Sequence, residues 1–265
     1  MKRVKIVIGL HTSMEFLEEA KNDKLLTVYG FEPNETLVNE IHNKFELPEN
    51  YIVINKAVSD YSGIVPFYIC SLDSCSSLMN WGNGPKLGEM KKIEVECIRM
   101  DEFIIENNID IIESVIIDTQ GNDLNVLNGF GDKITIVEQG VCESLSKDTH
   151  WKLYENQPPF LEFVKFFKKN NYSISWDWNW DKHQGKGQVW IPKNHSEKNG
   201  RNSSRRSQAS VRWLILMFHH WKKRCCDHAN EIQNTEIKNS CITIKVHPFQ
   251  VKVFSHEIQG HHIEC

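Results

Sequence analysis

The sequence predicts an α/β fold: a Rossmann-like, doubly wound, mainly parallel sheet of about seven strands with helices on both faces, followed by a poorly ordered C-terminal tail. Strand-like and helix-like segments alternate through the first two-thirds of the 265 residues, which is the pattern of βαβ units. The hydrophobic fraction of 40% and the charged fraction of 25% are typical of chains that bury a core. The composition then changes at about Pro192. These observations divide the chain into a domain of residues 1–192 and a tail of residues 193–265.

The domain is expected to begin with a strand, a helix and a second strand. Residues 4–9 are rich in β-branched side chains and end at a glycine. Thr12 or Ser13 is expected to cap a helix that runs through Ala20, because acidic residues stand in its first turn. Residues 25–31 form the second strand.

The next part of the chain adds a helix and three further strands. Pro33 opens a helix whose apolar residues recur at helical spacing. Residues 51–58 form the third strand, and residues 64–69 and 93–98 are expected to be extra strands. The loop between those two, around Trp81, is rich in glycine and proline, so we expect a turn-rich segment that covers the site as a lid.

The last third of the domain completes the predicted sheet. Its elements follow the same alternation, and glycines end the helix in the middle of the run. In order, we expect a helix at 101–106, a strand at 115–118, a helix at 124–127, a strand at 134–138, a helix at 160–169, and paired strands near Ile174 and Val189.

The tail has a different character from the domain. Between residues 193 and 224 basic residues face a single acid, Glu197, and serine, asparagine and glycine dominate its start. This composition is typical of a largely disordered extension. The tail also contains cysteine and histidine, but without zinc-ligand spacing, so we expect no metal site. It contains no recognisable nucleic-acid-binding module, and we do not expect a nucleic-acid partner.

The sequence also indicates where the protein works. The first ten residues are followed by acidic residues and no cleavage site, unlike a secretory signal. No stretch has the roughly 20 apolar residues of a transmembrane span. The eight cysteines show no disulfide-framework spacing. We therefore expect a cytoplasmic protein with reduced thiols.

Two acidic residues stand at the ends of predicted strands. Glu32 ends the second strand, and ligands of doubly wound sheets bind outside the carboxyl ends of the strands, where an acid about 20 residues after the first turn accepts hydrogen bonds from ribose. Asp118 ends a later strand before the turn at Gly121. The alternatives are an ordinary surface glutamate at position 32 and a helix cap at position 118. Together the two acids indicate a nucleoside-containing ligand.

These segments resemble the FkbM family of methyltransferases, mainly over residues 29–138 and weakly as far as residue 191. The resemblance rests on short motifs in the same order along the chain. They are Phe31-Glu32-Pro33, the 55–60 segment with Asn55, Ala57, Val58, Ser59 and Asp60, Met100-Asp101-Glu102-Phe103, Asp118 through Gly121 with Val126, Leu127 and Gly129, and Val137-Glu138. The resemblance implies a class I methyltransferase sheet, S-adenosylmethionine as cofactor, and a hydroxyl acceptor on a sugar or small metabolite.

The resemblance also implies roles for individual residues. Glu32 would bind the ribose hydroxyls, Val58 and Asp60 would flank the adenine, and Asp118 would lie near the methionine end of the cofactor. The full cofactor-binding set is Gly9, His11, Glu32, Val58, Asp60 and Asp118. A hydroxyl acceptor must lose a proton, and Asp118 is the first candidate for the catalytic base, followed by His11 and His183.

The chain departs from the family pattern in its first motif. The family has an acid and a glycine-rich turn there, whereas this chain keeps only Gly9 and has Ser13 in place of a later glycine. Ile116 stands where many members have lysine, and Gln120 where many have glutamate. The alternative function is therefore a catalytically inactive methyltransferase-like module that binds a ligand or partner. Neither the acceptor nor the oligomeric state can be predicted from the sequence.

Overall fold

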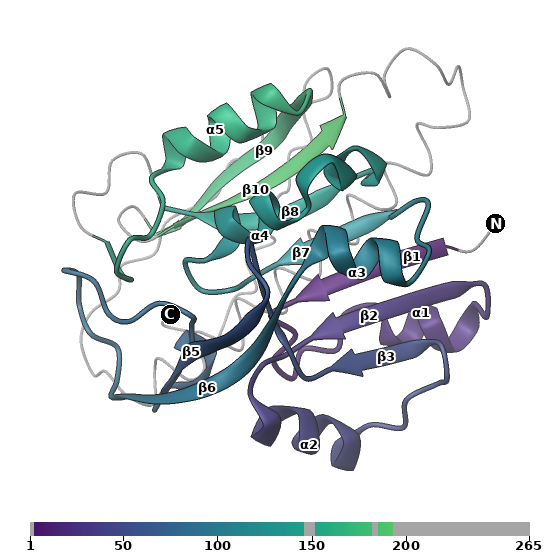
Figure 1. Cartoon of the computed structure of the whole chain (residues 1–265), viewed down its shortest axis with the longest axis horizontal. Coiled ribbons are helices and arrows are strands. Elements are labelled where there is room, and N and C mark those ends of the chain that lie inside the picture. Colours follow the sequence, from purple (N-terminus) through teal and green to yellow (C-terminus); the bar gives the residue numbers. More distant parts are fainter. Residues whose placement is uncertain (1–2, 146–151, 182–184, 193–265) are drawn as a thin grey trace, which may run out of the picture. The chain divides into compact units, whose positions relative to one another are not determined.

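The computed structural model describes residues 3–145, 152–181 and 185–192. Its main sheet has the strand order β3-β2-β1-β7-β8-β10-β9 (Figure 1). The strands from β3 to β8 are parallel, whereas β10 runs antiparallel to both β8 and β9. The predicted mainly parallel, doubly wound sheet is therefore confirmed. The tail, residues 193–265, lies outside the described residues.

The strand order reverses at β1, which is where doubly wound sheets bind ligands. The chain runs from β1 outward to β2 and β3 and then returns to β7 on the other side of β1. These elements are β1 (Arg3–Ile8), α1 (Leu17–Asn22), β2 (Leu26–Phe31), α2 (Glu35–Lys44), β3 (Tyr51–Ile54) and β7 (Ser114–Ile117). Asn34 caps α2 as a side-chain acceptor for the amide of Thr36, at 3.1 Å.

The chain between β3 and β7 forms a second, three-stranded sheet. Its order is β4-β6-β5, with β6 parallel to β4 and antiparallel to β5. The strands are β4 (Ala57–Ser59), β5 (Gly63–Cys70) and β6 (Met90–Arg99), and a short 3-10 helix, η1 (Asp73–Cys75), follows β5. The extra strands expected at 64–69 and 93–98 are confirmed as β5 and β6.

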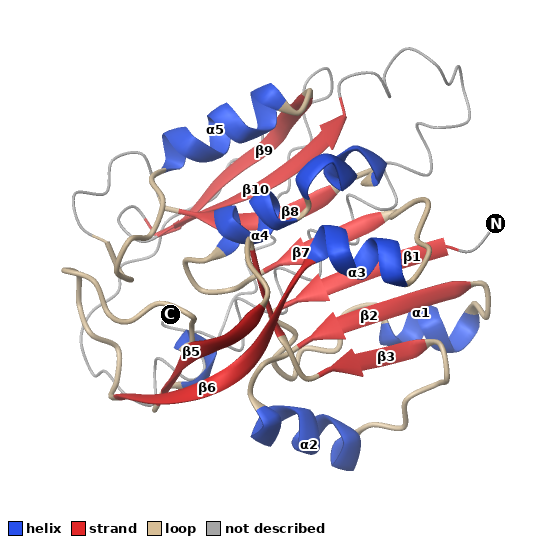
Figure 2. Ribbon diagram, viewed as in Figure 1, coloured by secondary structure: helices blue, strands red, loops and turns tan. Residues whose placement is uncertain are grey.

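The remaining elements cover and complete the sheet. They are α3 (Met100–Glu106), α4 (Asp123–Gly129), the 3-10 helix η2 (Gly131–Ile136), β8 (Gly140–Ser144), α5 (Phe160–Lys169), β9 (Tyr172–Asp181) and β10 (Gly185–Pro192). Figure 2 shows α3, α4 and α5 in front of the sheet and α1 behind it, so both faces carry helices. The main core lies under the front layer, where Phe103 packs edge-on against Tyr29 and Phe31.

Three local expectations were wrong. The first concerns the helix after β1, which begins at Leu17 and is not capped by Thr12 or Ser13. The Ser13 hydroxyl donates instead to the carbonyl of Leu10 at 2.7 Å, and the residue before the helix, Phe16, is left-handed with φ of 63°. A helix cannot continue backwards through a left-handed residue, so α1 is short.

The second concerns the strand expected at 51–58, which is two strands in different sheets. The chain turns at Asn55, whose side-chain amide donates to the carbonyls of Glu32 and Pro33, and Ala57 then pairs with β6.

The third concerns the strand expected at 134–138, which lies mostly in η2. A short buried apolar run has the same pattern in either conformation, and the true strand is β8.

Candidate functional site

The carboxyl ends of β1, β2 and β7 are level with one another. Ile8 is paired with Phe31 on one side and with Ile117 on the other. The residues that follow these three are Gly9, Glu32 and Asp118, so the sheet brings the predicted glycine and both predicted acids to one edge. This arrangement follows from parallel pairing, because parallel strands end on the same side of a sheet.

Gly9 is the point of closest approach between β1 and β7. Its φ is +83°, and a Cβ atom placed there would lie 1.8 Å from the carbonyl oxygen of Asp118. Such a distance is far inside van der Waals contact, so only glycine fits. The amide of Asp118 donates to the carbonyl of Ile8 at 2.9 Å, which fixes the two strand ends together.

The turn after Gly9 is left-handed at several non-glycine residues. His11, Met14 and Phe16 have φ of 48°, 54° and 63°. The family pattern has glycine in this turn, and this chain adopts glycine-like backbone conformations without it. A left-handed conformation costs a non-glycine residue about 1–2 kcal/mol, so the turn is strained.

Glu32 is held by backbone amides. Its carboxylate accepts hydrogen bonds from the amides of His11 at 2.8 Å and Asn34 at 2.9 Å, one on each oxygen. The residue is 5% exposed, and burial raises the pKa of its carboxyl group although the two amides act in the opposite direction. Asn55 supports the backbone here through its bond to the Glu32 carbonyl at 2.9 Å. Each carboxylate oxygen keeps a second lone pair for a ligand.

Asp118 lies at the end of β7 next to a polar side chain. Its Oδ1 accepts a hydrogen bond from Nε2 of Gln120 at 2.7 Å. Burial raises the pKa of Asp118 to about 6, while the Gln120 hydrogen bond and the nearby His11 lower it. A carboxyl group with this pKa is suited to accept a proton near neutral pH.

His11 connects the strand ends with the segment that follows β5. Its Nε2 is buried without a hydrogen-bond partner among the described residues and lies 3.3 Å from Oδ1 of Asp73, at a geometry that allows an ion pair when the imidazole is protonated. His11 also contributes to the electrostatic environment of both Glu32 and Asp118. The structure therefore brings together Gly9, His11, Glu32 and Asp118.

The other predicted site residues are placed differently. Val58 is 2% exposed in the main core, and its carbonyl accepts a hydrogen bond from the Asn122 side chain. Asp60 follows β4, and its carbonyl accepts a hydrogen bond from Arg99 at 2.6 Å. His183 lies outside the described residues.

Asp123 is a buried acid that the sequence analysis did not single out. It is 1% exposed and accepts hydrogen bonds from the amide and hydroxyl of Thr119 and from the amide of Glu143. Burial, and then the charge of Asp118, raise the pKa of Asp123 to about 7. The sequence signal for this residue was its position four residues after Thr119. Through its three hydrogen bonds Asp123 holds the start of α4 against β8.

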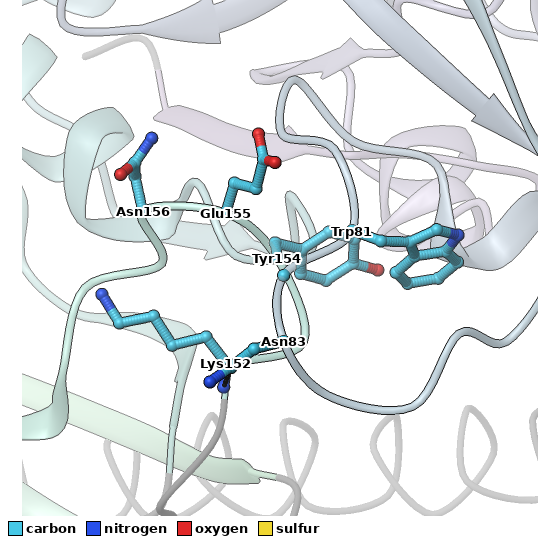
Figure 3. Close-up of a pocket in the computed structure, with 7 residues that line it drawn as sticks. Trp81, Asn83, Lys152, Tyr154, Glu155 and Asn156 are labelled. Atoms are coloured by element: carbon cyan, nitrogen blue, oxygen red, sulfur yellow. Dashed lines mark hydrogen bonds between the residues drawn. The ribbon is translucent and has the colours of Figure 1, made fainter.

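The segment from Ser71 to Glu89, for which a lid was predicted, contacts the residues that follow β1 and β7. Ser77 donates to the carbonyl of Gln120 at 2.7 Å, and the hydroxyl of Tyr154 lies 3.0 Å from the carbonyl of Cys75. Trp81 stacks on Tyr154, with ring centroids 5.4 Å apart. Beside this pair is an open hollow of about 600 Å³, and Figure 3 shows Lys152 among the polar side chains around it.

Two further observations concern ions and membranes. Among residues 3–145, 152–181 and 185–192, no group of three or more histidine, cysteine, aspartate or glutamate side chains could hold a metal ion. Within the same ranges, no helix has the length and apolar character needed to cross a membrane.

Comparison with known proteins gives a family and a set of distant folds. The sequence family described as the methyltransferase FkbM domain matches residues 7–174. No curated protein sequence matches the chain.

Solved structures match at low identity. Fibrillarin of Aeropyrum pernix, in complex with S-adenosyl-L-methionine, is 9% identical with a TM-score of 0.41, over 72% of this chain and 66% of that one. TrmK of M. capricolum, in complex with S-adenosyl-homocysteine, is 12% identical with a TM-score of 0.37, over 73% and 62%. Precorrin-6y C5,15-methyltransferase of Geobacter metallireducens is 11% identical with a TM-score of 0.39, over 72% and 80%. The chain thus spans less than two thirds of the first two.

Proposed function

The chain belongs to the FkbM methyltransferase family, and from this premise we propose that it transfers the methyl group of S-adenosylmethionine to a hydroxyl group of a sugar or small metabolite, with Asp118 as the base. The observation that carries the proposal is the meeting of Glu32 and Asp118 at the carboxyl edge of the sheet, on either side of the Gly9 turn. The four described cysteines are free, which agrees with a cytoplasmic enzyme.

The residues at the edge fit the polar parts of this cofactor. Glu32 presents a buried carboxylate whose orientation is set by two backbone amides, and its remaining lone pairs can accept both hydroxyls of a ribose. Gly9 brings β1 and β7 close enough for a ligand to contact both strand ends. By the family resemblance the methionine end of the cofactor would lie near Asp118, whose carboxylate would then offer negative charge to the sulfonium. When bound, the cofactor supplies an electrophilic methyl group.

Asp118 has the second role in the proposal. An acceptor hydroxyl is a poor nucleophile until its proton is removed, and a carboxylate positioned within hydrogen-bond distance can remove it. Since burial raises the pKa of Asp118 to about 6, the group is ionised at neutral pH and still basic enough to share a proton. The enzyme otherwise contributes alignment and exclusion of water.

The cofactor site is tested by calorimetric titration of S-adenosylmethionine into the full-length protein and its Glu32→Gln variant. The amide keeps the shape of the side chain but can no longer accept two amide hydrogens and two ribose hydroxyls, so we expect affinity to fall at least about tenfold, which is 1.4 kcal/mol. The matched control is Glu113→Gln. Glu113 accepts a hydrogen bond from Arg3 at the opposite end of β1, so its substitution should leave the affinity for S-adenosylmethionine unchanged. Equal affinities for Glu32→Gln and the wild type would contradict the site.

The catalytic role is tested with Asp118→Asn in an assay of methyl transfer to a panel of monosaccharides and hydroxylated metabolites. At saturating S-adenosylmethionine, we expect transfer by the variant to fall about 10²–10⁴-fold, the usual contribution of a general base. Transfer at the wild-type rate would remove Asp118 as the base.

The strained turn after Gly9 favours a second candidate, a methyltransferase-like module without activity. The turn contains three left-handed non-glycine residues, and α1 begins only at Leu17. On this candidate the wild-type protein binds no S-adenosylmethionine in the titration above, and a ligand or protein partner takes the place of the cofactor.

A further inference from the structure

The side chain of Gln120 links Asp118 to a buried tyrosine. Nε2 of Gln120 lies 2.7 Å from Oδ1 of Asp118, and Oε1 of Gln120 lies 3.1 Å from the hydroxyl of Tyr154. The same hydroxyl lies 3.0 Å from the carbonyl oxygen of Cys75. Tyr154 is 1% exposed, and its ring packs against Gly121.

These contacts present more acceptors than Tyr154 can satisfy. A phenol has one hydrogen, so its hydroxyl can donate fully to Gln120 Oε1 or to the Cys75 carbonyl, but not to both. When Asp118 is ionised, Gln120 must direct its NH₂ group to the carboxylate. One of the two acceptors around Tyr154 then lacks a full hydrogen bond.

A half-turn of the Gln120 amide removes this shortage when Asp118 carries a proton. Oδ1 of Asp118 then donates to Oε1 of Gln120, Nε2 of Gln120 donates to the Tyr154 oxygen, and Tyr154 donates to the Cys75 carbonyl. Each of the three contacts then has one donor and one acceptor. The half-turn only exchanges the places of Oε1 and Nε2 of Gln120, and no other heavy atom has to move. An amide can make this exchange because its oxygen and nitrogen ends have nearly the same shape.

We propose that Gln120 turns its amide with the protonation state of Asp118, and that Gln120 and Tyr154 are positioning residues that stabilise the protonated carboxyl group. The proton gained by Asp118 rests on Oδ1, between it and Gln120 Oε1, and it returns to solvent when the amide turns back. The chain of hydrogen bonds stands on the geometry above; its use in removing the proton of an acceptor rests on the proposed function.

Other titratable side chains surround Asp118, and the titration of Asp123 depends on that of Asp118, because burial and the charge of Asp118 raise the pKa of Asp123 to about 7. His11 approaches from the turn after β1, Asp123 from α4, and Cys75 from η1. Burial raises the pKa of Cys75 to about 12, so its thiol stays neutral over the range in which Asp118 titrates. The hydroxyl of Tyr154 contacts Gln120 and Cys75, whereas Asp123 is bonded to Thr119 and Glu143 and His11 to Glu32, so a substitution at Tyr154 is suitable for a test.

The test is an NMR titration of the Asp118 carboxyl carbon in the full-length protein and in Tyr154→Phe, without cofactor or acceptor. Loss of the hydroxyl removes two hydrogen bonds from the protonated arrangement and one from the ionised arrangement. With about 1 kcal/mol for each hydrogen bond, the pKa of Asp118 should fall by about 0.7. The matched control is Tyr172→Phe, which removes another buried hydroxyl, 2.8 Å from the carbonyl of Val137, and should leave the Asp118 titration unchanged.

A second variant covers the case in which Tyr154→Phe does not fold. Gln120→Glu places a second carboxyl group beside Asp118, so the pair should hold a shared proton and release it at a higher pH than the wild type. Unchanged titration of Asp118 in either folded variant overturns the proposal. Because these measurements need no methyl transfer, a protein that binds no cofactor would contradict the proposed function and still decide this inference.

Discussion

Gly9→Ala tests whether the close approach of β1 and β7 builds the site. The new Cβ atom would lie 1.8 Å from the carbonyl oxygen and 2.7 Å from the carbonyl carbon of Asp118. Both contacts are with backbone, so no side-chain rotation can relieve them. The strand ends must separate, and Asp118 must move with them.

The magnitude has two parts. The left-handed backbone at φ of +83° costs an alanine about 1–2 kcal/mol, and overpacking in a well-packed region costs about 1–3 kcal/mol. Together they predict a loss of about 2–5 kcal/mol in the free energy of unfolding, a large part of the roughly 5–15 kcal/mol typical of a domain. Gly63→Ala is the matched control, because Gly63 also has positive φ, +137°, but no atom lies within 4 Å of its Cβ position.

The assay is urea unfolding of both variants, followed by titration of S-adenosylmethionine under conditions where both are folded. We expect Gly9→Ala to be less stable than Gly63→Ala and to lose cofactor affinity at least tenfold, whereas Gly63→Ala keeps wild-type affinity. Equal unfolding midpoints for the two variants would refute the reasoning, because the contact with Asp118 would then have no energetic consequence.

Three further outcomes are expected. Because burial raises the pKa of Asp118 to about 6 and the base acts when ionised, kcat/KM should rise about tenfold per pH unit below 6 and level off above it; a flat profile from pH 5 to 8 would exclude this base. Asp123→Ala should lower the free energy of unfolding by about 2–4 kcal/mol in a denaturant titration, because it leaves two backbone amides unpaired. Gly129→Ala should cost about 1–3 kcal/mol by the same measurement, since its Cβ would lie 2.1 Å from the carbonyl oxygen of Ser59; a stabilised variant would contradict the packing of α4 on β4.

The sequence was sufficient to predict the carboxyl edge of the sheet. Strands with β-branched residues were recognisable from local composition, and parallel pairing places the residues after them on one edge. Gly9, Glu32 and Asp118 each follow such a strand directly, so their meeting required no knowledge of side-chain packing. Their roles toward a cofactor remain predictions.

Local patterns failed where a distant contact changes the backbone. The run from 51 to 58 has the composition of one strand, but the Asn55 side chain bonds to the carbonyls after β2 and turns the chain into a second sheet. The helix expected after β1 begins late because Met14 and Phe16 adopt left-handed conformations that their residue types do not indicate. The first effect depends on a contact between residues far apart in the chain, and the second on backbone conformations that the local pattern does not predict.

The sequence by itself therefore determined the order of the strands along the chain, the mainly parallel sheet and the acids at its carboxyl edge. These features follow from periodicity and from residues adjacent in the chain. The tertiary structure alone decided the protonation environment of that edge. Asp118 meets Gln120 nearby in the chain, but Tyr154 joins them from 34 residues beyond Gln120. The pKa of a carboxyl group depends on the burial and hydrogen bonds that surround it in space, and these exist only once the chain has folded.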